Sequence, residues 1–359
     1  MPVWFNLTSA WIPEKEGWSF MRPVKIVERS GNDLTDFQVK VELNSSNFDF
    51  SRANADGSDI RFADESGRQL PYWVESWDAS GEQAVVWVKV PSIPASGTAT
   101  IYMYYSNPSA TSESDKTQVF YQIDSVYLEY RINEGSGATL NDGSGTSNIA
   151  STIYGATWTS GTIDYALYFD GSNDYTKTTS TFGLTNGVTI EAIVRIVDTS
   201  SNYEAFVYHG TANEWGLWKD PNRHFHFGFR ASDGSWNTLS GNLVYDTSKW
   251  YHVVARYSIN DGYIRIFVDG ELDAEKYVGK AMSTGTDELW LGTKAQYEWT
   301  NCYIDEVRIF SKGLSNEEAS YLSNGRVVYS ASDEGVIFVR KYTDPEPTVT
   351  VRTTDVWLA

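Results

Sequence analysis

The chain has 359 residues, and 47 acidic against 28 basic residues give it a formal net charge of −19. Such an acidic surface does not suit partners that are held by phosphate neutralisation, so we exclude nucleic acid and anionic membranes. The length exceeds what one hydrophobic core usually serves and predicts two domains. The single cysteine, Cys302, excludes a disulfide framework and thiolate metal sites. We expect it to be a buried residue on a strand.

The chain contains no apolar run of about 18 residues that could span a membrane. Its first residues, Met1–Trp18, lack the basic-then-apolar order of a secretory signal. We therefore expect an extracellular protein on a cell or virion surface. Either an export signal has been removed, or the protein is assembled inside a cell into a particle that is released later.

Aromatic residues make up 15% of the chain, and Gly outnumbers Pro by 28 to 10, which favours short strands and tight turns. Period-two alternation predicts strands, in chain order, at 37–43, 84–90, 100–105, 126–130, 188–196, 224–230, 250–257, 263–268 and 302–310. One short helix is predicted near 315–324, because Ser315 and Glu318 can form a capping box and Asn324-Gly325 can end the helix. The expected fold class is all-β, with two β-sandwich domains.

The predicted domain limits follow the turn clusters. Residues 1–110 form an N-terminal β-sandwich, 111–124 a linker, 125–325 a second sandwich and 326–359 a C-terminal β tail. The tail contains two strand-like runs, 335–342 and 348–353. These runs either return to the first domain or add an edge strand to a neighbouring subunit.

The second half resembles the laminin-G-like branch of the concanavalin-A-like lectin and glucanase sandwiches. The phrases that carry the resemblance come in the family's order and include Ala166–Gly171, Thr189–Ala192, Trp250–Ala255, Val268–Gly270 and Ile304–Phe310. The resemblance implies a jelly roll. The first half looks like an uncharacterised domain that precedes such modules in archaeal and bacterial surface proteins, and it implies no activity.

The resemblance also implies a structural Ca²⁺ between the Phe-Asp-Gly turn and the late Asp-Glu-Val strand. The matching positions are Asp170, Asp174 and Asp305, with Gly171 beside them. Carboxylates and turn carbonyls are the hard oxygen ligands that calcium takes. The alternative is that Asp170 and Asp174 shape a turn while Asp305 pairs with Arg308 or another base.

The run Glu271-Leu-Asp273-Ala-Glu275 matches the catalytic strand of retaining glucanases that share this sandwich. The match implies Glu271 as the nucleophile and Glu275 as the acid/base, on one face of an alternating strand. However, the run follows the hairpin turn Asp269-Gly270, which favours an exposed acidic hairpin arm. We therefore expect no catalysis, and a glycoside hydrolase ranks third among the hypotheses.

The richest region for ligand binding is 208–236, because sugars are bound by aromatic faces together with amide and carboxylate groups. The candidate residues are Asn213, Glu214, Trp215, Trp218, His224 and Trp236. Several aromatic residues of this region alternate and are expected in the core.

These observations favour a non-catalytic adhesin or carbohydrate-binding surface protein that binds a glycan or a surface protein, without membrane insertion. The alternative is a structural subunit of a virion or cell-surface filament. In that case a homo-oligomer would assemble through the Trp-rich N-terminal segment 4–11 or through the C-terminal strands.

Overall fold

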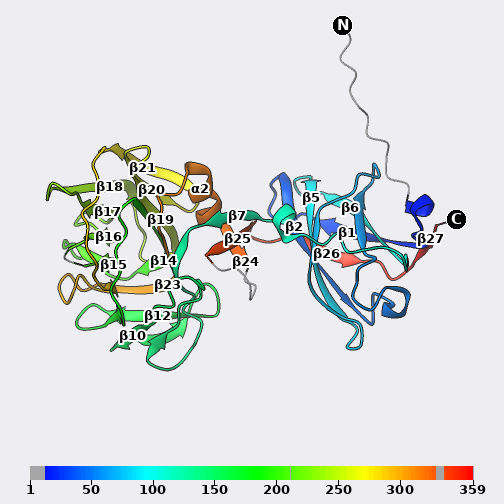
Figure 1. The fold of residues 1–359 in the computed structure, drawn as a ribbon, viewed down its shortest axis with the longest axis horizontal. Coiled ribbons are helices and arrows are strands. Elements are labelled where there is room, and N and C mark those ends of the chain that lie inside the picture. Colours follow the sequence, from blue (N-terminus) through cyan, green and yellow to red (C-terminus); the bar gives the residue numbers. More distant parts are fainter. Residues whose placement is uncertain (1–12, 211, 329–334, 359) are drawn as a thin grey trace, which may run out of the picture. The chain divides into compact units, whose positions relative to one another are not determined.

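The computed structural model describes residues 13–210, 212–328 and 335–358, and it divides the chain into two units (Figure 1). Unit 1 comprises the residues up to Tyr121 and those from Arg340 on, and unit 2 comprises Gln122–Val339. The Trp-rich segment 4–11 lies outside the described residues. Because the chain leaves unit 1 and later returns to it, unit 2 is an insertion in unit 1.

Unit 1 is a sandwich of two antiparallel sheets. The first sheet has the order β26-β1-β6-β3 and consists of β1 (Phe20–Val27), β3 (Arg61–Asp64), β6 (Thr98–Tyr105) and β26 (Thr348–Val351), with β27 (Val356–Trp357) also on β1. The second has the order β2-β5-β4 and consists of β2 (Leu34–Asn44), β4 (Tyr72–Asp78) and β5 (Gln83–Ile93). Short helical turns are η1 (Pro13–Glu16), η2 (Phe50–Arg52) and α1 (Lys116–Val119).

Of the two predicted C-terminal runs, 348–353 returns to the first domain, where it forms β26, whereas 335–342 forms β25 (Val336–Lys341), which lies in another sheet. β26 pairs with Val24–Val27 and β27 with Phe20–Met21, so both strands cover the same edge of β1. The carboxylate of Asp355 fastens the segment, because it accepts hydrogen bonds from Arg22 Nε at 2.7 Å and Arg52 Nη1 at 2.6 Å. The part of the predicted tail from Arg340 on therefore belongs to unit 1, and the part before it belongs to unit 2.

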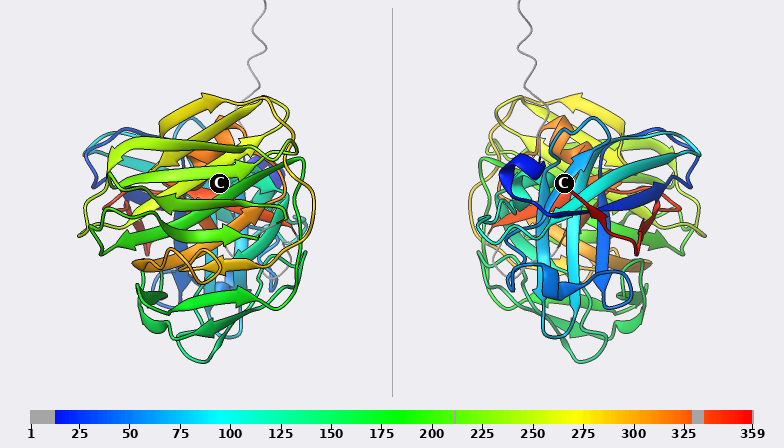
Figure 2. Two further views of the ribbon diagram at one scale, coloured as in Figure 1. Left: turned by 90° about the vertical axis from the view of Figure 1, so that its left-hand side faces the viewer. Right: turned by 90° about the vertical axis from the view of Figure 1, so that its right-hand side faces the viewer.

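Unit 2 contains two eight-stranded antiparallel sheets. Sheet I has the order β18-β17-β16-β15-β22-β13-β10-β9 and consists of β9 (Thr139–Leu140), β10 (Ser151–Tyr154), β13 (Tyr175–Thr178), β15 (Glu204–His209), β16 (Trp215–Lys219), β17 (His224–Arg230), β18 (Trp236–Val244) and β22 (Leu289–Leu291). Figure 2 (left) looks onto the strands of this sheet.

Sheet II has the order β11-β12-β23-β14-β19-β20-β21, and β8 also pairs with β23. Its strands are β8 (Val126–Tyr130), β11 (Thr157–Ser160), β12 (Tyr165–Asp170), β14 (Gly187–Ile196), β19 (Tyr251–Ser258), β20 (Tyr263–Val268), β21 (Glu271–Tyr277) and β23 (Asn301–Phe310). Where the chain enters and leaves unit 2, β7 (Tyr121–Asp124), β24 (Gly325–Val328) and β25 (Val336–Lys341) form a small sheet.

One continuous apolar core joins sheets I and II and includes Leu167, Ile190, Trp215, Phe227 and Cys302. The all-β fold class is confirmed, and Cys302 is buried as expected. Burial raises the pKa of its thiol well above the usual value.

The predicted helix is α2 (Asn316–Asn324), and the capping box of Ser315 and Glu318 is present. No helix among the described residues is long and apolar enough to cross a membrane.

Candidate functional site

Strands β16 and β17 of sheet I have one face in the core and one face outside it. Trp215 and Leu217 of β16 and the phenylalanines of β17 belong to the core cluster. Trp218 and His226 lie on the opposite side of the same strands, because successive side chains of a strand point to opposite faces. The sheet therefore presents a second set of rings on its outer face.

We call this second set, together with a tyrosine from the loop before β15, the aromatic face. Its members are Tyr203, Tyr208, Trp218, His226, Trp236 and Trp290.

The rings of the aromatic face contact one another across strands. Trp218 lies edge-on to Trp236 and to His226, with ring centroids 6.1 Å apart in both pairs, and Tyr203 meets His226 at 5.3 Å. Trp218 is almost fully buried, whereas Trp236 is 37% exposed and Tyr203 is 45% exposed. The inner rings thus support two outer rings that solvent, and hence a ligand, can reach.

Charged groups border these rings. The guanidinium of Arg230 lies 5.1 Å from the centre of the Trp236 ring, and Lys294 Nζ lies 5.5 Å from it. Glu214 accepts hydrogen bonds from Arg230 Nε and from the Tyr208 hydroxyl. Glu298 Oε2 accepts one from Trp218 Nε1 at 3.1 Å. Flat apolar rings thus lie beside donors and acceptors in a fixed arrangement.

Of the six predicted ligand-binding residues, the structure brings three to this face. Trp218 and Trp236 are in contact, and Glu214 reaches the edge through Arg230. His224, at the start of β17, is partly exposed and lies 3.1 Å from the Asp220 carboxylate.

The prediction is corrected for Asn213 and Trp215, because neither has any exposed surface. Asn213 Oδ1 accepts hydrogen bonds from Trp215 Nε1 at 3.0 Å and from the Leu184 amide at 3.1 Å. Its Nδ2 donates to two carbonyls, those of Leu184 and Ser283. Both residues are part of the core, and no ligand reaches them.

Sequence reasoning missed Tyr203, Trp290, Lys294 and Glu298. Trp290, Lys294 and Glu298 come from a segment far from 208–236 in the chain, and the pairing of β15 with β22 brings this segment there. Tyr203 lies only five residues before the region that the sequence singled out. The one available signal was Leu289-Trp290-Leu291, in which a tryptophan alternates with two core leucines.

The predicted calcium ligands do not all gather. Asp170, Gly171 and Asp174 share one turn, in which Asp174 Oδ2 accepts a hydrogen bond from the Asp170 amide at 3.0 Å. Burial and the neighbouring charge of Asp170 raise the pKa of Asp174. Asn301, opposite Asp170 in the β12–β23 ladder, has a buried Oδ1 without a hydrogen-bond donor. The turn therefore supplies oxygen atoms that suit a hard cation.

Asp305 lies four residues beyond Asn301 on β23, which is about 13 Å along a strand. Its Oδ2 accepts hydrogen bonds from the amide and the hydroxyl of Thr162, at 2.9 and 2.8 Å. Its other oxygen, Oδ1, is buried without a donor. Asp305 therefore does not join the Asp170 turn. Among the described residues, no three His, Cys, Asp or Glu side chains form a group that could hold a metal ion.

The Glu271–Glu275 run lies on the edge strand β21, and a β-bulge interrupts it. Leu272 pairs with Phe267 and Ala274 with Ile266, which leaves Asp273 unpaired in the ladder. The bulge breaks the alternation that a shared carboxylate face requires. Moreover, the Asp273 carboxylate accepts hydrogen bonds from the Asn242 and Leu243 amides, and Glu275 pairs with Arg265 at 2.7 Å. This arrangement does not match the geometry of two opposed catalytic carboxylates.

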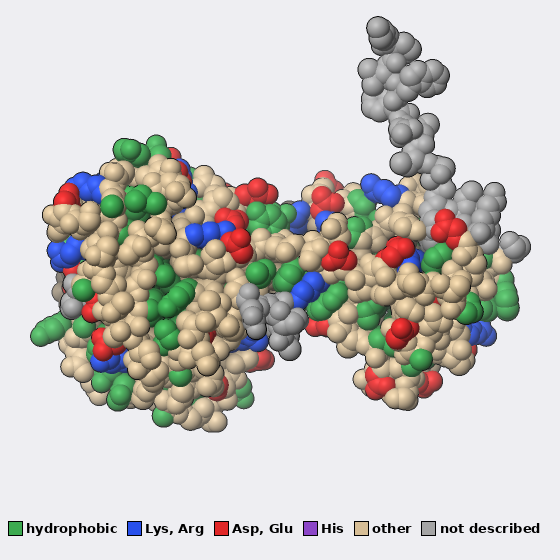
Figure 3. All heavy atoms as spheres, viewed as in Figure 1, with side chains coloured by type: hydrophobic (Ala, Val, Ile, Leu, Met, Phe, Trp, Pro, Cys, Tyr) green, Lys and Arg blue, Asp and Glu red, His purple; other side chains and the backbone are tan. Residues whose placement is uncertain are grey.

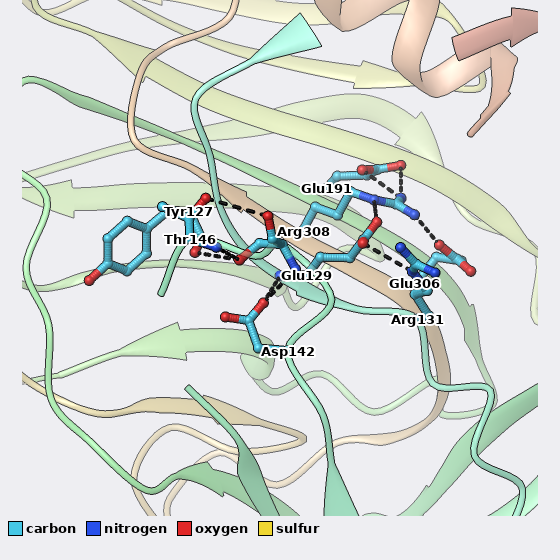
Figure 4. Close-up of polar contacts among 9 residues, drawn as sticks. Tyr127, Glu129, Arg131, Asp142, Thr146, Glu191, Glu306 and Arg308 are labelled. Carbon is cyan, nitrogen blue, oxygen red and sulfur yellow. Dashed lines mark hydrogen bonds and ion pairs between the residues drawn. The ribbon is translucent and has the colours of Figure 1, made fainter. Parts of the chain in front are cut away.

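A buried ion network that the sequence did not reveal surrounds Arg308 (Figure 4). Arg308 Nε donates to Glu129 at 2.6 Å, Nη1 donates to both oxygens of Glu191 at 3.0 Å, and Nη2 donates to Glu306. His252 Nε2 also contacts Glu191, at 2.7 Å. The alternative in which Asp305 pairs with Arg308 is not found, because the guanidinium is bonded to three other carboxylates and Asp305 accepts hydrogen bonds from Thr162 and Ile163.

Removing one partner of a buried ion pair typically costs about 3–5 kcal/mol of stability. Arg308 and its three carboxylate partners are at most 3% exposed. We therefore assign this network a structural role in joining β8, β14 and β23.

Family comparisons agree with this architecture. Residues 56–130 match the model of a domain of unknown function, DUF2341, and residues 169–320 match the model of the concanavalin A-like lectin/glucanases superfamily. The greater part of unit 2 is thus similar to concanavalin A-like domains. The arrangement expected from the sequence, an uncharacterised domain before a lectin-like sandwich, is thereby confirmed. Comparison with curated proteins gives no match.

Several solved structures resemble the chain at low identity. The binding domain of botulinum neurotoxin DC in complex with SialylT is 18% identical, with a TM-score of 0.46, over 56% of this chain and 51% of that chain. The binding domain of Paraclostridial Mosquitocidal Protein 1 is 11% identical, with a TM-score of 0.47, over 58% and 55%. This chain thus spans about half the length of the structures that it matches. Likeness at this level carries no argument about function.

Burial, with the neighbouring charge of Glu306, raises the pKa of Asp305 to about 7. A carboxyl whose folded pKa is raised stabilises the fold while it is protonated, and this stability is lost as the pH rises through the folded pKa. We predict that Asp305→Asn loses less thermal stability than the wild type between about pH 4 and about pH 7.

The measurement is Tm against pH by calorimetry, with the exposed Asp56→Asn as the control. Glu204, whose pKa burial also raises to about 7, keeps part of the pH dependence in every variant. Equal falls in Tm for Asp305→Asn and the wild type would contradict the assignment.

Proposed function

We propose that the protein is a non-catalytic carbohydrate-binding surface protein and that the aromatic face of unit 2 is its glycan site. The observation that carries the proposal is the partly exposed Trp236 ring, which lies edge-on to Trp218 and has the cationic groups of Arg230 and Lys294 over it. The lectin-like fold of unit 2 agrees with it.

The chemistry of the face suits a sugar. The C–H surface of a pyranose packs on an aromatic ring, while its hydroxyl groups require donors and acceptors at the ring's edge. Trp236 and Tyr203 supply exposed rings, and Arg230 supplies N–H donors. Because Arg230 and Trp218 are each hydrogen-bonded to a carboxylate, much of the arrangement is fixed before a ligand arrives.

An adhesive role follows if this site is displayed outside a cell or on a virion. Unit 1 then acts as a spacer or as an assembly module. On the face seen in Figure 3, hydrophobic side chains lie in small separate patches among polar ones, which suits a surface in contact with water.

The test is a glycan-array screen of the full chain and of Trp236→Ala. We expect the wild type to bind a restricted set of glycans and Trp236→Ala to bind them at least about tenfold more weakly, a loss of about 1.4 kcal/mol. The matched control is Tyr277→Ala, which removes another exposed ring, on β21 of sheet II. A blank array from folded protein, or equal binding by Trp236→Ala, would refute the proposal.

We also propose that Asp170 and Asp174 hold a structural Ca²⁺, with Asn301 Oδ1 nearby. Calcium would neutralise two carboxylates of one turn, whose charges now repel each other. The expected result is that a chelator lowers the Tm of the wild type but not that of Asp174→Asn. An unchanged wild-type Tm would exclude a structural calcium.

A further inference from the structure

The rings on the outer face of sheet I continue beyond the aromatic face. Tyr175 on β13 lies 5.3 Å from Trp290, measured between ring centroids. On the next strand, β10, Tyr154 stacks on Tyr175 at 4.5 Å, and the planes of the two rings differ by 18°. We call Tyr154 and Tyr175 the distal pair.

Strand register places the distal pair on the outer face. The two tyrosines are direct partners in the β10–β13 ladder, and Ile153, the residue before Tyr154, belongs to the core. Since successive side chains of a strand point to opposite faces, the distal pair points away from the core. Tyr208 and Trp290, which are also direct partners, connect this pair to Trp218 and the rest of the aromatic face.

The resulting row of rings is accessible at its two ends. It crosses sheet I from β18 to β10, a distance of six strand spacings or about 29 Å (Figure 2, left). Trp236 at one end is 37% exposed and Tyr154 at the other is 44% exposed, whereas Tyr208 and Trp290 in the middle are at most 9% exposed. One face of the sheet thus has two separate rings on which a sugar can stack.

The loop between β22 and β23, residues 292–300, connects the two ends. Lys294 Nζ lies 5.5 Å from the ring centroids of both Tyr208 and Trp236. Two residues further on, Gln296 Nε2 donates a hydrogen bond to the Tyr175 hydroxyl at 3.4 Å, and the Gln296 side chain is exposed. The same short loop therefore places hydrogen-bonding groups beside each of the two exposed rings.

Two exposed rings on one face, joined by a polar loop, favour a single long ligand. One sugar unit is far shorter than the distance between the rings, whereas an extended chain of several units can span it. Once such a chain is bound at one ring, its contact with the other ring forms within the same complex, which raises the overall affinity. Chains of β-1,4-linked pyranoses are extended and carry apolar C–H faces along their length, which pack on aromatic rings.

We propose that the distal pair is a second glycan-contacting patch and that the ligand is a linear β-1,4-linked oligosaccharide that reaches from Trp236 to Tyr154. This proposal rests on the proposed function of the aromatic face and narrows its ligand to a chain of several sugar units. Tyr154 contributes the exposed ring, Tyr175 stacks on it, and Gln296 supplies an amide group at its edge.

The test compares a short and a long probe on the full chain by calorimetric titration. The probes are the disaccharides and hexasaccharides of β-1,4-linked glucose, mannose and N-acetylglucosamine. In at least one series we expect the hexasaccharide to bind at least about tenfold more tightly than the disaccharide. We expect Tyr154→Ala to lower the hexasaccharide affinity to about that of the disaccharide and to leave the disaccharide affinity unchanged. Trp236→Ala weakens the binding of both.

The matched control is Tyr165→Ala, because Tyr165 is 45% exposed and lies on β12 of sheet II. This variant is expected to bind as the wild type does. Tyr154→Phe keeps the ring and is expected to retain most of the hexasaccharide affinity. A wild-type Tm for each variant shows that the fold is intact.

Equal affinity of the wild type for disaccharide and hexasaccharide would overturn the proposal. Full hexasaccharide binding by Tyr154→Ala, or no binding of any of the three series, would also overturn it. If Trp236→Ala still weakens the binding of some glycan, the proposed function survives these results with a short or differently linked ligand. The proposed function itself fails only if the wild type binds no glycan or if Trp236→Ala binds as well as the wild type, so the two failures are distinguishable.

Discussion

Strands β16 and β17 use both of their faces, and this constraint determines both the core of unit 2 and its candidate site. Each strand must send one row of side chains into the core between sheets I and II. Period-two geometry then sends the other row to the outer face. Because both rows contain aromatic residues, one short segment builds the core through Trp215 and the candidate site through Trp218. The functional surface is thus fixed by the same packing that stabilises the domain.

Buried charge is the second recurring device of unit 2. Arg308 joins three strands through three carboxylates, and Lys219 fixes the loop that carries Tyr203. Both cations lie out of contact with water, so each is surrounded by oxygen atoms. Those around Arg308 come from three strands, and those around Lys219 come from one short loop. The first network stabilises sheet II, whereas the second shapes the edge of the aromatic face.

Much of the fold could be predicted, because alternation and ordered phrases such as Ala166–Gly171 are local signals. The capping box of Ser315 was equally readable, since four residues of sequence contain both of its partners. The spacing of Trp215 and Trp218 already placed them on opposite faces, but which face was buried depends on strand partners that are distant in sequence. The position of Asp305 likewise depends on a strand partner that is distant in sequence. Asn301 pairs with Asp170 in the ladder, and Asp305 lies four residues further along the extended strand, so it lies away from the Asp170 turn.

The central claim is that a glycan contacts the outer face of sheet I, and the indole N–H signals of the 14 tryptophans test it most directly. Two-dimensional nitrogen–proton spectra would be recorded during titration with a glycan that the array selects, and signals would be assigned by single Trp→Phe variants. The account predicts that the signals of Trp236 and Trp218 shift, while that of Trp215 in the core stays in place. Shifts confined to tryptophans outside the aromatic face would contradict the account.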